Sequence, residues 1–192
     1  MTQHTNQPHV IGLGTAALPS LTSGFRLLTT GKDSDGSLAL IETCERRGSG
    51  PPLHRHSREA ELIVVLEGRV TFHIGGDHFQ GTAGTCAVLQ RGTEHRYVVE
   101  SDEARLLNVL VPAGFEECLS TVSHILYGTP MEHELKVGQD GERLVATFAR
   151  YGVEVTGSAA EKQCHPHLFI TQGQADVPPT AVLRSVATAG RD

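Results

Sequence analysis

Short apolar runs separated by turn residues fill the chain between residues 25 and 112 and limit the folds open to it. Each run is four to eight residues long and rich in Val, Ile, Leu, Thr or aromatic side chains. The breaks have turn chemistry, as at Asp35-Gly36 and Gly75-Gly76. Strands at this spacing, without helical patterns between them, predict an all-β sandwich or small barrel. The expected strands are Phe25–Thr30, Leu38–Glu45, Glu61–Leu66, Val70–Ile74, Cys86–Leu89, Tyr97–Glu100 and Ala104–Val111.

The spacing of apolar residues changes after Pro112. Two sets recur at helical intervals, and they are Phe115, Leu119, Val122 and Leu126, followed by Leu144, Val145, Phe148 and Tyr151. Asp140 is the expected N-cap of the second helix and Gly152 its expected stop. We therefore expect an N-terminal segment at 1–24, a β-barrel at 25–112, a C-terminal helical extension at 113–155 and an irregular tail at 156–192.

Composition narrows the function classes. A net charge of -6 and the lack of long basic runs argue against a nucleic-acid partner. No apolar run has the length of a membrane span, and the first Lys or Arg is Arg26, so a secretory signal is not expected. The four cysteines are far apart and contain no C-x-x-C pair, which favours reduced thiols. We expect a cytoplasmic protein without a membrane partner.

Three histidines and one glutamate form the strongest chemical pattern. His54 and His56 are two residues apart, so on a strand both side chains point to one face, about 6.6 Å apart at the backbone. Glu61 begins the next expected strand, and His95 lies at the start of a later one. Neutral imidazole with carboxylate suits Fe, Ni, Mn, Co, Cu or Zn as divalent ions. The pattern predicts one divalent transition metal ion per chain, held by these four residues.

Several other polar residues have simpler interpretations. Glu59 is close to Glu61 in the sequence, and we expect its side chain to be solvated. His73 and His78 flank an expected hairpin and are interpreted as exposed. The tract His165-Pro166-His167 resembles a small metal-binding run, but it falls in the expected tail.

The spacing of these residues resembles that of the cupin superfamily. The first cupin motif, G-x5-H-x-H-x4-E-x6-G, is matched by Gly48, His54, His56, Glu61 and Gly68. The second, G-x5-P-x-G-x2-H-x3-N, is matched by Gly84, Gly92 and His95, whereas Gln90 and Val99 replace its proline and asparagine. The resemblance implies a jelly-roll-like small β-barrel with one or two C-terminal α-helices.

Within cupins the chain resembles the single-domain quercetinase-like group. The features are Thr43-Cys44-Glu45, His95-x-Tyr97, Ala113-Gly114-Phe115-Glu116 and a segment from Glu142 to Val153. This resemblance implies a metal-dependent dioxygenase that acts with O2 on an enolised or polyphenolic small molecule. Glu61 would be both metal ligand and general base. Tyr97 would contact substrate, with ordinary core packing as the alternative.

Two other functions stay open for the same ligand set. One is a non-oxidative metal-dependent cupin enzyme (isomerase, cyclase, lyase or decarboxylase) in which the metal polarises a carbonyl. The other is a cupin that binds a small molecule without turnover. The absence of tryptophan and the total of nine Phe and Tyr residues limit the stacking surface for a flavonol. Because small barrels cover apolar edges by pairing, we also expect a homodimer.

Overall fold

The computed structural model describes residues 24–127 and 137–157. Its elements, in chain order, are β1 (Gly24–Thr29), β2 (Ala39–Arg46), β3 (His54–His56), β4 (Ala60–Glu67), β5 (Arg69–Ile74), β6 (Asp77–Thr82), β7 (Cys86–Leu89), β8 (His95–Val99), β9 (Glu103–Val111), α1 (Phe115–Tyr127), α2 (Val137–Arg150) and β10 (Val153–Val155). The seven expected strands are all present, and their ends either coincide with the expected ones or are shifted by one or two residues.

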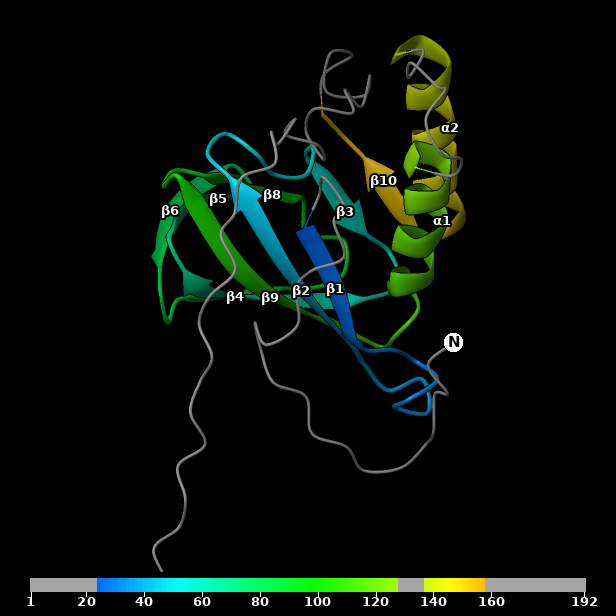
Figure 1. Ribbon diagram of the computed structural model, residues 1–192, viewed down its shortest axis with the longest axis horizontal. Coiled ribbons are helices and arrows are strands. Elements are labelled where there is room, and N and C mark those ends of the chain that lie inside the picture. Colours follow the sequence, from blue (N-terminus) through cyan, green and yellow to red (C-terminus); the bar gives the residue numbers. More distant parts are fainter. Residues whose placement is uncertain (1–23, 128–136, 158–192) are drawn as a thin grey trace, which may run out of the picture.

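The strands form two five-stranded antiparallel sheets that face each other (Figure 1). One sheet has the order β1-β2-β9-β4-β7 and the other β10-β3-β8-β5-β6. The chain passes between sheets at tight corners such as Gly68, which has φ of 85°. A Cβ there would lie 2.4 Å from the carbonyl oxygen of Glu103, so only glycine fits. The expected all-β architecture with C-terminal helices is confirmed.

Alternation along the strands places one side of each sheet in a common core. Ile63 and Val65 of β4 and Leu106 of β9 meet Phe72 of β5 and Val99 of β8 there. Each of these side chains is buried. Glu61 of β4 pairs with Leu110 of β9. Residues paired across antiparallel strands share a face, so the side chain of Glu61 points into the barrel as that of Leu110 does.

The helices cover one end of the sandwich. Cys118 and Val122 of α1 pack with Leu144 and Phe148 of α2 and with Val153 of β10. β10 pairs with β3, so the helical extension also contributes an edge strand to the second sheet. Figure 1 shows both helices on the side of the molecule where β3 and β10 lie.

The boundary of the second helix differs from the sequence expectation. α2 begins at Val137, so the interpretation of Asp140 as its N-cap is wrong. The first turn, Val-Gly-Gln-Asp, has no apolar period that would reveal it. The expected stop is confirmed, because α2 ends at Arg150 and Gly152 has φ of 83°.

The outer face of the first sheet carries an apolar row beside the ion pairs that Glu42 forms with Arg26 and Arg105. Leu62, Val88 and Val109 occupy one cross-strand row on that face. Val88 on β7 is 64% exposed. No helix in residues 24–127 and 137–157 is long and apolar enough to cross a membrane. Nearly all of the expected N-terminal segment and tail, including the tract at His165, lies outside the described residues.

Candidate metal centre

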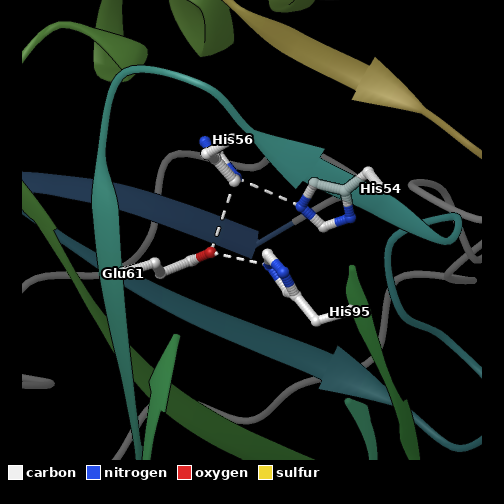
Figure 2. Close-up of side chains that lie close together, drawn as sticks. All are labelled: His54, His56, Glu61 and His95. Atoms are coloured by element: carbon white, nitrogen blue, oxygen red, sulfur yellow. Dashed lines mark hydrogen bonds and ion pairs between the residues drawn. The ribbon is translucent and has the colours of Figure 1, made fainter. Parts of the chain in front are cut away.

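Four side chains from three strands converge inside the barrel (Figure 2). His54 and His56 come from β3, Glu61 from β4 and His95 from β8. Nε2 of His56 lies 3.2 Å from Nε2 of His54 and 3.5 Å from Oε2 of Glu61, which lies 3.1 Å from Nε2 of His95. One ligand atom from each residue falls within 4.8 Å of the others. The structure therefore brings together all four residues that the sequence singled out.

Strand pairing explains this convergence. His54 pairs directly with His95, so both side chains leave the sheet on the same face. The turn before His95 is tied to β3, because Gly92 N–H donates to the carbonyl of His56 at 2.7 Å. Thr93 N–H also donates to the carbonyl of Gln90 at 3.0 Å. The turn is thus formed although Gln90 replaces the proline of the cupin motif.

The distances fit a first-row transition metal ion. Bonds of about 2.1 Å place two ligand atoms about 3.0 Å apart at right angles and about 3.4 Å apart in a tetrahedron. The ring orientations fit as well, because Nδ1–H of His54 donates to Pro52 O at 2.8 Å and that of His95 to Thr93 O at 2.9 Å. Each Nε2 then turns a lone pair toward the centre, where lone pairs and a carboxylate would repel without a cation.

The protonation states favour metal ligation. Burial, and then the neighbouring His95 and His56, lower the pKa of His54 to about 3. Its imidazole is therefore neutral near pH 7. Burial acts to raise the pKa of Glu61, but its close contact with His95 and the electrostatic influence of His56, His95 and His54 outweigh burial and leave the pKa below its ordinary value. Glu61 is therefore a carboxylate.

Glu59 contradicts its sequence interpretation. We expected a solvated side chain, but Glu59 is 3% exposed and its Oε2 lies 3.5 Å from Nδ1 of His56. Part of the cover comes from the residue just before α1, because a Cβ built at Gly114 would lie 3.6 Å from Oε1 of Glu59. Because Gly114 follows more than fifty residues later, no local pattern reveals this contact.

Phe115 is a second neighbour that sequence reasoning did not connect with the site. Its ring stands edge-on to His56, with centroids 4.9 Å apart and planes at 81°. It is partly buried and also stacks on Phe148 of α2 at 6.5 Å. The first turn of α1 therefore supplies an apolar wall beside one of the four ligand candidates.

Tyr97 lies inside the barrel, two residues beyond His95. Its ring belongs to the main core, and its hydroxyl donates to Oε1 of Glu45 at 2.6 Å. Burial raises the pKa of Glu45 to about 7, although the hydrogen bond from Tyr97 acts to lower it. Burial and the nearby Glu45 raise the pKa of Tyr97 well above 10. Substrate contact by Tyr97 stays a prediction.

The other histidine pair does not join this cluster. His73 on β5 pairs directly with His78 on β6, and their ring centroids are 4.3 Å apart. His78 is exposed as expected, whereas His73 is partly buried. In the part of the chain that the structure describes, neither belongs to a group of three or more metal-ligating side chains.

Comparison with known proteins agrees with this architecture. The cupin domain family matches residues 41–110. Quercetin 2,3-dioxygenase from Bacillus subtilis (strain 168) is 27% identical over 97 residues, which cover 50% of this chain and 29% of that protein. The chain therefore spans less than a third of the length of that relative.

Two solved structures resemble part of the chain at low sequence identity. A protein with a double-stranded β-helix domain from Klebsiella pneumoniae has a TM-score of 0.48 and 15% identity, covering 56% of this chain and 92% of that one. A predicted oxalate decarboxylase from Thermotoga maritima has a TM-score of 0.45 and 21% identity, covering 47% and 80%. The family match at residues 41–110 contains all four converging side chains, so the chain carries a cupin domain there.

Proposed function

We propose that this protein is a metal-dependent dioxygenase that acts with O2 on an enolised or polyphenolic small molecule. The observation that carries the proposal is the buried set of three imidazoles and one carboxylate, in which each donor atom faces the others. The partial similarity to a quercetin 2,3-dioxygenase supports the oxidative form of the reaction. One divalent ion per chain (Fe, Ni, Mn, Co, Cu or Zn) suits the donors.

The bound ion would act as a Lewis acid toward a substrate oxygen and, where it is redox-active, support electron transfer to O2. His54, His56 and His95 would hold it through Nε2. Glu61 accepts the proton of the substrate's enol or phenol hydroxyl at a carboxylate oxygen. Its low exposure keeps bulk water away from that proton transfer. Phe115 offers an apolar edge for the body of the substrate next to His56.

The same residues support a non-oxidative reaction as the second candidate. An anionic Glu61 beside a divalent ion is also the arrangement needed to remove a proton next to a metal-polarised carbonyl, as in an isomerase or decarboxylase. The limited aromatic content favours this candidate over a flavonol as substrate. Cys44, Cys86 and Cys118 are free thiols, which supports a cytoplasmic location for either reaction.

Metal analysis and oxygen uptake test the proposal together. Protein purified without added metal should contain about one transition metal ion per chain, and His54→Ala and Glu61→Ala should lose it. Glu154→Gln is the control, because Glu154 is exposed and pairs with Arg55. Metal retained in both site variants would contradict the site.

Metal-loaded protein should then consume O2 with flavonols or related 1,3-dicarbonyl compounds. Glu61→Gln should reduce turnover by about 100-fold or more, since general base catalysis contributes roughly that factor. No O2 uptake with any of these substrates would refute the dioxygenase. Turnover that is unchanged under strict anaerobiosis would select the non-oxidative enzyme.

A further inference from the structure

We propose that Glu59 is a positioning residue of this centre, which holds His56 by accepting a hydrogen bond from Nδ1–H. The inference rests on the proposed metal site and adds a fifth side chain to it. That side chain does not contact the ion. It determines which nitrogen of His56 faces the centre and how strongly that nitrogen donates.

The three histidines differ in how their outer nitrogen is bound. Nδ1 of His54 and Nδ1 of His95 each face a backbone carbonyl of a residue two positions earlier, at 2.8 and 2.9 Å. Nδ1 of His56 has no such carbonyl, and in the part of the chain that the structure describes it is buried without a hydrogen-bond partner. Since a buried donor without a partner costs about 1–3 kcal/mol, a third acceptor is needed.

Glu59 supplies the matching unpaired acceptor. Its Oε2 is also buried without a hydrogen-bond partner among the described residues, and it lies 3.5 Å from Nδ1 of His56. A shift of about 0.6 Å would bring the two atoms to hydrogen-bond distance. The two unsatisfied atoms therefore complete each other, and the third histidine gains the same type of anchor as the other two.

The packing around Glu59 keeps its carboxylate against His56. Glu59 is as buried as His56, each being 3% exposed. On the outer side lie Gly114, at which an added Cβ would be 3.6 Å from Oε1 of Glu59, and Phe115 at the start of α1, edge-on to His56. A buried carboxylate is stable only with a compensating partner. The imidazole of His56 is held between an aromatic edge and an anion, which determines its orientation before any ion binds.

Charge gives Glu59 a second effect. Glu59 and Glu61 are both buried next to His56, so two carboxylates would balance one divalent ion in a site of low dielectric constant. Replacing Glu59 by a neutral side chain leaves a net positive charge when the ion is bound. This should weaken binding and disfavour higher oxidation states of the ion.

Cobalt(II) is a suitable probe because its visible spectrum reports ligand geometry. We expect Glu59→Ala to bind cobalt(II) 10–100-fold more weakly than wild type in competition with a chelator. Glu59→Gln should be intermediate, since its amide oxygen can accept the hydrogen bond without the charge. Glu59→Asp should recover part of the affinity. The cobalt(II) absorption bands should shift in Glu59→Ala.

Glu116→Gln is the matched control. Glu116 is similarly buried and accepts hydrogen bonds from the backbone N–H groups of Gly31 and Gly114, so its loss perturbs the same helix without touching a histidine. Its cobalt(II) affinity and spectrum should equal those of wild type. If Glu59→Ala does not fold, Glu59→Gln is used for the test, because the Gln side chain has nearly the same size as that of Glu.

The outcomes separate the two proposals. Wild type that binds cobalt(II) at the four-residue centre, with Glu59→Gln and Glu59→Ala within threefold of it and unchanged in spectrum, overturns the role of Glu59 alone. An equal loss in Glu116→Gln also overturns it, because the effect would then be a general one of α1. Wild type that binds no cobalt(II) overturns the metal site and the role of Glu59 together.

Discussion

The buried carboxyl of Glu45 should make the stability of this protein depend on pH, and Glu45→Gln should remove that dependence. Burial raises the pKa of Glu45 from its ordinary value of 4.5 to about 7, with the hydrogen bond from Tyr97 offsetting part of the rise. The carboxyl therefore keeps its proton in the folded chain at pH values where the unfolded chain has released it. Protons then favour folding.

The sign and the size follow from this difference in pKa. Because the folded pKa is the higher one, the contribution is fully present below pH 4.5 and is lost as the pH rises through about 7. At about 1.4 kcal/mol for each pKa unit, the loss of unfolding free energy amounts to about 3 kcal/mol. The Gln side chain has no proton to release, so Glu45→Gln should not show this loss of unfolding free energy.

Urea unfolding of metal-free protein between pH 4.5 and 8, followed by circular dichroism, measures this loss. The unfolding free energy of wild type minus that of Glu45→Gln should fall by about 3 kcal/mol across the range. The subtraction cancels the titration of the site histidines, which both proteins share. Glu154→Gln, which removes an exposed carboxylate, should run parallel to wild type. Parallel curves for wild type and Glu45→Gln would refute the reasoning.

Three further changes test the packing and the assembly. Gly50→Ala should lower the unfolding free energy by about 3 kcal/mol in chemical denaturation, because the new Cβ would lie 1.9 Å from the carbonyl oxygen of Tyr97. Gly76→Ala should lower it less, because the space around Gly76 is open and only its positive φ is unfavourable for alanine. Phe115→Ala should lower the unfolding free energy by about 2 kcal/mol, since the ring links α1 to the barrel; an unchanged value would show that it packs loosely. The homodimer stays a prediction: light scattering should find two copies at micromolar concentration, and Val88→Glu, in the apolar row of the outer face, should give monomers.

Much of the barrel could be predicted because each strand carries its own signal. β4 and β9 are long apolar runs bounded by turn residues, and their ends were found to within one residue. β6, with the sequence Asp-His-Phe-Gln-Gly-Thr, is almost entirely exposed at a sheet edge and has no apolar pattern to reveal it. β10 has three residues, and its pairing with β3 joins segments nearly a hundred positions apart.

The sequence by itself determined the four ligand candidates and the type of fold that presents them. His54, His56 and Glu61 lie within one short motif. On a strand, side chains alternate between the two faces, so the spacing of such residues determines the face to which each side chain points. The tertiary structure decided what surrounds them. Glu59 lies against His56 rather than in water because the chain at the start of α1 lies beside this pair. Burial and pKa depend on contacts between distant segments, which no periodicity records.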